Sequence, residues 1–535
     1  MAIPTNLLAS YPLAARNPAL ARRLAAFFFV AVILQSVHVA YVLSGGAARI
    51  ATFFPDDAFY YLRVARYFAS QGHWTFDGSA PATGFHLLWG YGWAAVFALA
   101  PGLDLPGIYV LSFGVGVACY VLSAAALATL VVECYGSTAL LAVVALFLGS
   151  SLFVLPALGM ESAPTLLFAS AVCLLLFRPR REPMRWPQLA MLYGAGLLGM
   201  LSRSDFGVLA FACLAACIVD SARRRDLSIR AVRPALICFA GAVTGLALVM
   251  GHCWLVSGQL LQASAQTKYF WSSLNGHAIT APLLLLASSI VYKLPWATTS
   301  MYLVLSMLSI AIAVGVRHTL RTQAPIAPVV AGILAIVGYV LLYSRDSRAL
   351  QIWYVASFGA PLTLVCAPAA VAVGNRFRSL TIGLVVIAAA GIFALSLRPL
   401  WPNQQGLKDA GEFLAARPEL APVGAWNAGS IGYFAGRPVT NLDGLINDDI
   451  LPYARSGTLA DYVRKRHLAY IVDYPAMFGG KLALRGGYAD GVLARCLQAQ
   501  VQIDADRPNL RWEDTVLTLY KVDSQCLESH ATSAR

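Results

Sequence analysis

Charged residues are scarce in this chain. Asp, Glu, Lys and Arg together make up 12% of its 535 residues, whereas 59% of the residues are hydrophobic. A soluble globular chain has about a quarter of its residues charged, so this composition predicts a multi-pass membrane protein. Basic residues outnumber acidic ones and give a net charge of +13. They stand in short groups between apolar segments, which is typical of cytoplasmic loops and not of a nucleic-acid-binding surface.

Several motifs of soluble catalysis are also missing. The sequence has no Gly-x-Ser-x-Gly, no Walker-type glycine loop and no dinucleotide-binding fingerprint, which argues against an ATP-driven pump and against nucleotide cofactors. It lacks the closed set of Cys and His ligands that structural zinc sites use. Eight of the ten cysteines fall in or beside apolar runs, while Cys496 and Cys526 stand apart near the C-terminus. Outside an inner membrane these two can form a disulfide.

The positions of the basic groups predict how the chain crosses the membrane. The first apolar run of spanning length covers residues 24–44, and the last covers residues 380–398. The basic groups are Arg16/Arg22/Arg23, Arg178/Arg180/Arg181/Arg185, Arg223/Arg224/Arg225/Arg230/Arg233, Arg317/Arg321 and Arg376/Arg378. If all of these lie in the cytoplasm, the N-terminus is cytoplasmic and the first loop, residues 45–83, lies outside.

The number of crossings between two cytoplasmic groups must be even, so the apolar runs cannot all be separate spans. One run between residues 83 and 177 is therefore expected to be half-spanning, re-entrant or fused with a neighbour, and the short run at 281–291 to lie in an external loop. We predict a mainly α fold with about eleven transmembrane helices in residues 1–398 of a bacterial inner-membrane protein.

Residues 399–535 differ in character from the rest of the chain. Their charge density rises, and their apolar runs shrink to strand length at 422–426, 469–472 and 515–520. Helical patterns at about 405–416 and 457–467 lie between these runs. The segment is expected to form a small extracytoplasmic α/β domain.

The first external loop carries the most suggestive polar groups. Asp56 and Asp57 directly precede an amphipathic helical pattern, followed by Arg63 and, further on, by His86. One carboxylate can serve simply as a helix cap, but a pair of them is better explained by function. A carboxylate kept ionised at a helix N-terminus is suited to act as a general base. Alternatively, Asp56 and Asp57 can bind a divalent cation through oxygen ligands.

Further candidates come from other loops that the charge rule places outside. The residues that we select for substrate binding are Arg63, His86, Glu161, Arg203, Lys268, Arg345, Arg348 and Tyr354. Arg345 and Arg348 either clamp a phosphate or anchor a helix at the membrane interface together with Tyr354. Arg203 and Lys268 are weaker candidates for phosphate. Glu161 is either a second acid or a carboxylate that begins a helix.

These residues resemble a known family. The first-loop string Asp56-Asp57-Ala58-Phe59-Tyr60, continued by FDGSAPATGFHLLW, is similar to the GT-C superfamily of membrane glycosyltransferases, in particular to protein mannosyltransferases and arabinofuranosyltransferases. Gly159-Met160-Glu161-Ser162, the Arg348–Tyr354 element and WNAGSIGYFAGRPVTNLDGLIND resemble recurring features of the same family. The chain departs from the family's common pattern at Ala82 and Leu87, where Asn and Pro are usual.

The resemblance implies a transferase that moves a sugar from a polyprenyl-phosphate donor to a hydroxyl of an envelope glycan, lipid or protein on the outer face of the membrane. Asp56 then corresponds to the general base, with Asp57 as its partner or as a metal ligand. Arg345, Arg348 or Lys268 neutralises the departing lipid phosphate. The alternative is a transporter or flippase of lipid-linked sugars that cleaves no bond. A transporter would carry ionisable residues near mid-span, whereas here they gather at one face.

Overall fold

The structure of the chain is a computed structural model. It describes residues 18–180, 182–226, 228–274, 276, 278–292, 297–345, 350–479, 482–488, 491–503 and 516–533. The chain divides into two compact units. Unit 1 consists of Met1–Tyr41, Val110–Leu246 and Ala278–Arg398, and unit 2 of Val42–Tyr109, Ala247–His277 and Pro399–Arg535.

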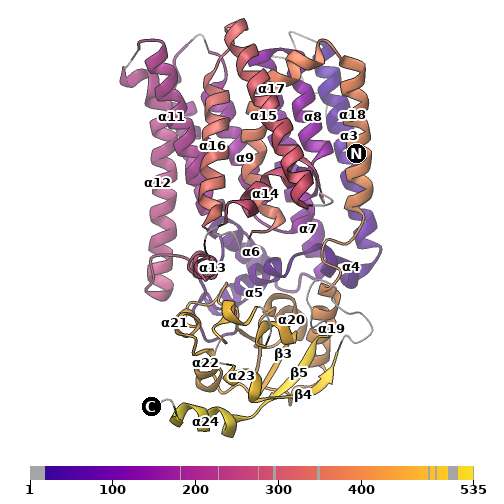
Figure 1. Ribbon diagram of the computed structural model, residues 1–535, viewed down its shortest axis with the longest axis vertical. Coiled ribbons are helices and arrows are strands. Elements are labelled where there is room, and N and C mark those ends of the chain that lie inside the picture. The colour runs from indigo at the N-terminus through magenta and orange to yellow at the C-terminus, as the bar shows by residue number, and fades with distance from the viewer. Residues whose placement is uncertain are drawn as a thin grey trace. The chain divides into compact units, whose positions relative to one another are not determined.

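Unit 1 is built of helices, several of which run side by side as a bundle (Figure 1). Two of its helices continue into unit 2 by more than one turn: α7 (Leu105–Tyr135) and α12 (Ile229–Ser257). The others are α3 (Pro18–Leu43), η1 (Ser137–Ala139), α8 (Leu140–Gly149), η2 (Ser151–Leu158), α9 (Ser162–Phe177), α10 (Trp186–Ser202), η3 (Ser204–Phe206), α11 (Gly207–Arg223), α14 (Thr280–Ile290), α15 (Ala297–Thr322), α16 (Ala327–Ser344), η4 (Ile352–Val355), α17 (Ala356–Gly374) and α18 (Arg378–Ser396).

Within the described residues, eight helices are long and apolar enough to cross a membrane. A ninth span is obtained if the bent pair Ser137–Gly149 and Ser151–Leu158, which meet at 51°, counts as one. Three shorter apolar helices remain, at Leu87–Leu99, Ser162–Phe177 and Thr280–Ile290. The charge rule requires one irregular run between residues 83 and 177, and the described elements there that qualify are the bent pair, Leu87–Leu99 and Ser162–Phe177. α14 is also shorter than a span, and its predicted place in an external loop stays a prediction.

The core of unit 1 is centred on α17. Most of this helix is buried, and it packs against α8, α9, α15 and α16. Small residues permit this close packing: a Cβ on Gly332 of α16 would lie 2.8 Å from the backbone oxygen of Pro361 of α17. Close approach through small residues is how helices associate in lipid, where the hydrophobic effect between helices is weak.

Unit 2 combines helices with a five-stranded sheet. Its helices are α4 (Gly46–Phe53), α5 (Asp56–Gln71), α6 (Leu87–Leu99), α13 (Ala263–Ser273), α19 (Gln404–Ala415), α20 (Ala428–Ala435), α21 (Leu451–Ser456), α22 (Leu459–Lys465), η5 (Pro475–Met477), η6 (Ala483–Gly486), α23 (Val492–Arg495) and α24 (Ser524–Ser533). Its strands are β1 (Val423–Ala425), β2 (Thr440–Asn441), β3 (Tyr470–Asp473), β4 (Leu497–Gln502) and β5 (Thr518–Val522).

The sheet has the order β2-β1-β3-β5-β4 and is mixed. β1 pairs in parallel with β2 and β3, whereas β5 runs antiparallel to β3 and β4. In register, Val423 lies opposite Tyr470, and Ile471 opposite Tyr520. Three strands and two helices of this region begin and end close to the positions expected from the sequence, which confirms the α/β character of the C-terminal segment.

A disulfide joins Cys496, beside β4, to Cys526 of α24, with their Cα atoms 5.5 Å apart. The boundary expected at residue 399 coincides with the start of the last segment of unit 2. The unit is larger than the expected C-terminal domain, however, because it also takes in residues 42–109 and 247–277. The first loop and the C-terminal segment therefore belong to the same compact body.

Candidate active site

The candidate active site in unit 2 is organised by Asp56, the first residue of α5. The helix begins at Asp56 because Pro55 fixes an extended conformation before it, and no side chain caps α5. Instead, the Asp56 carboxylate accepts hydrogen bonds from the backbone N–H groups of Gly429 (3.2 Å) and Ser430 (2.6 Å). These groups lie in the first turn of α20, where helix N–H groups have no partner within their own helix. Asp56 thus caps a helix far away in the sequence.

The loop that precedes α20 is held by a second carboxylate. Asp473, at the end of β3, accepts hydrogen bonds from the backbone N–H groups of Trp426, Asn427 (2.9 Å) and Tyr474 (2.8 Å). The Asn427 side chain donates to the same carboxylate over 2.9 Å. Two buried or half-buried acids therefore fix the backbone of the WNAGS segment, which was noted in the sequence without a role.

Arg63 holds the other end of α20. It lies two turns after Asp56 on α5 and is buried, with 7% of its surface exposed. Its guanidinium donates to the backbone oxygens of Gly432, Arg437 (3.1 Å) and Phe76 (3.4 Å). An acid at the N-terminus and a cation near the C-terminus both match the dipole of α20. Arg63, predicted to bind substrate, is engaged with these backbone carbonyls, and its predicted role stays a prediction.

A third carboxylate, Asp443, stands close to Asp57. Asp443 is buried in the turn after β2 and accepts hydrogen bonds from the backbone N–H of Leu445 (2.6 Å) and from the hydroxyl of Tyr60 (3.0 Å). The side-chain amide of Asn441 donates to the same hydroxyl over 2.9 Å. Tyr60 lies on α5, one turn after Asp56. The cluster of Asp56, Asp57 and Asp443, here called the acidic cluster, thus joins the first loop to the C-terminal segment.

The acidic cluster has unusual proton affinities. Burial raises the pKa of Asp56 to about 7, and the neighbouring charge of Asp57 adds to the increase, against the hydrogen bonds from Ser430 and Gly429. Burial likewise raises the pKa of Asp443 to about 7, again with a contribution from Asp57. Carboxylates whose pKa values lie near neutrality are typical of sites that accept or donate protons.

In the part of the chain that the structure describes, no third His, Cys, Asp or Glu side chain joins Asp56 and Asp57 to complete the predicted cation site. There, the His, Cys, Asp and Glu side chains whose donor atoms lie mutually within 4.8 Å are Cys496, Cys526 and His530. The two cysteines of that group form the disulfide.

Two further predicted residues also lie in unit 2. His86 comes directly before α6, and its backbone N–H donates to the hydroxyl of Tyr61 over 3.3 Å. Lys268 is half-buried on α13. The preceding residue, Thr267, donates to the backbone oxygen of Gly444 over 2.7 Å. Lys268 is therefore adjacent in sequence to a residue that contacts the turn carrying Asp443.

Unit 1 brings together three of the other predicted residues. Arg203 lies between α10 and η3 and is 2% exposed. It forms ion pairs with Glu161 (2.8 Å) and with Asp205 (2.7 Å), and its guanidinium lies 4.4 Å from the centroid of the Tyr354 ring. The hydroxyl of Tyr343 donates to Asp205 over 2.6 Å. We call this set the Arg203 cluster.

The composition of the Arg203 cluster bears on the phosphate-binding role predicted for Arg203. One guanidinium faces two carboxylates, so a phosphate ligand would have to compete with these two acids for the Arg203 side chain. Glu161 comes directly before α9 and makes no cap with its side chain; the ion pair with Arg203 accounts for its burial. Arg345 is exposed at the end of α16, and Arg348 lies outside the described residues.

Sequence reasoning missed Tyr60, Asn441 and Asp443. Each belongs to a string that was noted for its resemblance, but none had a role, because their proximity depends on contacts across nearly four hundred positions. A usable signal is present in the sequence: the dipeptide Asp443-Gly444 is typical of a turn, and functional residues are often carried by loops.

Comparison with known proteins gives two kinds of result. A family model described as a domain of unknown function, DUF8728, matches residues 397–520, which cover most of the C-terminal segment. No curated protein matches the chain by sequence.

Solved structures share the fold over most of the chain. The crystal structure of ArnT from Cupriavidus metallidurans, bound to undecaprenyl phosphate, is 12% identical with a TM-score of 0.56, covering 93% of this chain and 97% of ArnT. The Archaeoglobus fulgidus oligosaccharyltransferase without ligand is 14% identical with a TM-score of 0.52, covering 87% and 71%. The same enzyme tethered to an acceptor peptide with an NVT sequon gives the same identity, TM-score and coverage. The chain shares the GT-C membrane fold of these structures, as the resemblance of its first loop implies, and its long apolar helices are those of a multi-pass membrane protein.

Proposed function

We propose that this protein is a glycosyltransferase that moves a sugar from a polyprenyl-phosphate donor to a hydroxyl of an envelope glycan, lipid or protein. The observation that carries the proposal is the acidic cluster, in which Asp56 is held by the N-terminus of α20 and has a pKa of about 7. The fold supports it, because structures of the same fold include an enzyme bound to undecaprenyl phosphate and an oligosaccharyltransferase.

In the proposed reaction, Asp56 removes the proton from the acceptor hydroxyl as its oxygen attacks the anomeric carbon of the sugar. The bond between that carbon and the lipid phosphate breaks, and the phosphate leaves with the electron pair. The two backbone N–H groups hold the Asp56 carboxylate in one orientation, while each oxygen keeps a lone pair for the incoming proton. A base whose pKa lies near the working pH transfers protons efficiently.

Asp57 supports this reaction by charge. It lies close enough to Asp56 and to Asp443 to raise the pKa of each, and so it keeps the base from becoming too weak a proton acceptor. Lys268, whose neighbour Thr267 contacts the Asp443 turn, is the proposed counter-charge for the departing phosphate within unit 2. Arg345 and Arg348 are the corresponding candidates from unit 1.

The protein is proposed to lie in a bacterial inner membrane with the N-terminus in the cytoplasm and the acidic cluster outside. The second candidate function, translocation of lipid-linked sugars, would need ionisable groups within the spans. The Arg203 cluster, at the start of the span Ser204–Arg223, is the observation that favours it.

Transfer by the purified, reconstituted protein distinguishes the two functions. A panel of polyprenyl-phosphate sugars and envelope-extract acceptors is offered to the native chain, Asp56→Asn and Asp57→Asn, with and without chelator. We expect transfer by the native chain and a loss of about 10²–10⁴-fold in Asp56→Asn, the usual contribution of a positioned base. Thermal unfolding of each variant separates loss of chemistry from loss of the α20 cap.

Three results would change the assignment. If Asp57→Asn alone is inactive, the two acids exchange roles. Full activity in both variants would remove the general base from the mechanism. Movement of lipid-linked sugar across the bilayer without transfer by any form of the protein would replace the transferase with a transporter.

A further inference from the structure

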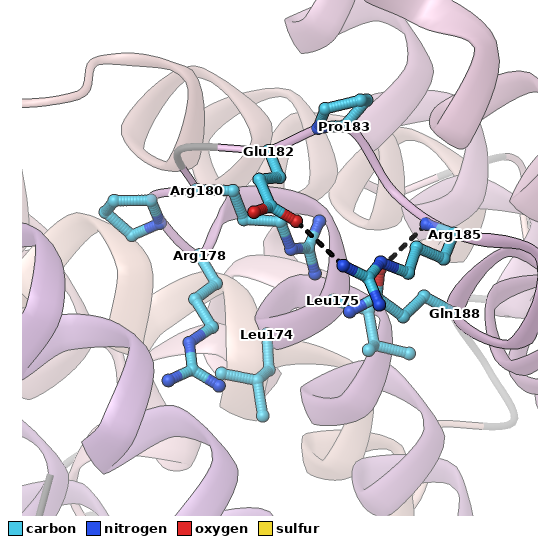
Figure 2. A pocket seen from close by; sticks show the side chains of 9 residues that line it. Leu174, Leu175, Arg178, Arg180, Glu182, Pro183, Arg185 and Gln188 are labelled. Carbon is cyan, nitrogen blue, oxygen red and sulfur yellow. Dashed lines mark hydrogen bonds and ion pairs between the residues drawn. The ribbon is translucent and has the colours of Figure 1, made fainter. Parts of the chain in front are cut away.

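A basic pocket of about 540 Å³ lies in unit 1 at the loop between α9 and α10, apart from both clusters described above. Figure 2 shows Arg178, Arg180 and Arg185 around it, together with a single acid, Glu182. All three arginines belong to a basic group that the charge rule predicts to be cytoplasmic.

The three arginines differ in how far their charge is already matched. Arg178 forms a bidentate pair with Glu133 (2.8 and 2.7 Å), which fixes it in the pocket wall. Arg185 pairs with Glu182 over 3.1 Å, but both side chains are more than 70% exposed, and exposed pairs contribute little to stability. Arg180 is half-buried, and none of the described carboxylates lies within ion-pair distance of it. Burial and repulsion by Arg178 lower the pKa of Arg180, against the weaker attraction of Glu133.

The pocket also has an apolar side. Leu174 and Leu175, from the last turn of α9, line it beside the arginines. Trp186 begins α10 and is 73% exposed, and the guanidinium of Arg233 lies 4.9 Å from the centroid of its ring. Leucine, exposed tryptophan and arginine together are typical of the boundary between lipid headgroups and hydrocarbon.

We infer that this pocket binds the phosphate group of an anionic phospholipid. Arg180 supplies the unmatched charge, and Arg185 exchanges its exposed pair with Glu182 for a stronger charge-assisted hydrogen bond to phosphate. Leu174 and Leu175 contact the start of the acyl chains. The site is separate from the proposed donor site, because no residue of the acidic cluster takes part.

Native mass spectrometry of the purified protein tests the inference. Phosphatidylglycerol, phosphatidylcholine with the same acyl chains, and inorganic phosphate are added in turn, and thermal unfolding is measured in parallel. We expect selective binding of phosphatidylglycerol, weakened about tenfold in Arg180→Gln and further in the double variant Arg180→Gln/Arg185→Gln. Arg321→Gln, which removes an exposed arginine at the end of α15, is the matched control and is expected to bind normally.

Equal binding of the two lipids, or phosphatidylglycerol binding that survives in the double variant, would overturn the inference. Stabilisation by inorganic phosphate with the same dependence on Arg180, but without lipid selectivity, would keep the phosphate site and reject the lipid as its source. Sugar transfer is measured in none of these arms, so failure here is independent of the proposed function.

Discussion

The two units bury their carboxylates in different ways. In the Arg203 cluster of unit 1, Glu161 and Asp205 both face one guanidinium, at 2.8 and 2.7 Å. In the acidic cluster of unit 2, Asp56 and Asp443 are held by backbone N–H groups and a tyrosine hydroxyl. An arginine stabilises the ionised form of an acid. Neutral donors stabilise the ionised form less. The increase in pKa caused by burial therefore exceeds the decrease caused by the hydrogen bonds, and the pKa values of Asp56 and Asp443 rise to about 7.

This difference indicates a division of labour. The ion pairs of the Arg203 cluster connect the residues before α9, α11 and η3 and suit a structural role. Asp56 and Asp443, with pKa values of about 7, are present in both ionised and protonated forms at neutral pH, which suits proton transfer. The same residue types therefore serve a structural role in one unit and a proposed chemical role in the other.

The largest stability effect is expected in the Arg203 cluster. Arg203→Met removes the guanidinium that faces the buried Glu161 and the half-buried Asp205, which should cost about 3–5 kcal/mol of unfolding free energy. Thermal unfolding in detergent measures the loss, with the exposed Arg321→Gln as control. A variant of native stability whose KM for the donor is raised would contradict the structural role and restore Arg203 as a phosphate ligand.

Gly429→Ala tests the contact between α5 and α20 without changing an acid. A Cβ at this position would lie 2.2 Å from the backbone oxygen of Asp56, so one of the two helices must shift. We expect a loss of about 1–3 kcal/mol, as for other overpacked sites, and reduced transfer. The control is Gly92→Ala on α6 of the same unit, where no atom lies within 4 Å. Native activity in Gly429→Ala would show that the cap does not position the base.

How stability depends on pH should separate the two clusters further. The folded pKa values of Asp56 and Asp443, about 7, exceed the ordinary value of 3.8. Between these values the folded state binds more protons than the unfolded state, so this contribution to stability is present at low pH and is lost as pH rises from about 4 to about 7.

Asp443→Asn should reduce this slope, as measured by unfolding temperature at several pH values. An unchanged slope would mean that Asp443 does not titrate in this range.

Thiol labelling in intact cells addresses the side of the membrane on which each region lies. An impermeant reagent should label His73→Cys, in the exposed end of the first loop, above the background of the native cysteines. It should not label Arg224→Cys. Both native positions are exposed. The reverse pattern would overturn the topology and with it the external acidic cluster.

Many helices and strands of unit 2 could be predicted from short stretches of the sequence. The Asp56-Asp57 pair before an amphipathic pattern predicts α5, and strand-length apolar runs predict β1, β3 and β5. β4 was overlooked although Leu497, Ala499 and Val501 alternate with glutamines, because its residues are mostly exposed and edge strands bury few apolar groups. The contacts of Asp56 and Arg63 with α20 could not be predicted from the sequence, because each of them joins residues more than 360 positions apart.

The dependence of the transfer rate on pH tests the central claim most directly. If Asp56, with its pKa of about 7, is the base, kcat/KM of the reconstituted native chain should rise about tenfold per pH unit below pH 7 and level off above it. Asp56→Asn should remove this rise along with most of the activity. A rate that stays constant between about pH 5 and 8, or an unaltered profile in Asp56→Asn, would contradict the assignment of the base.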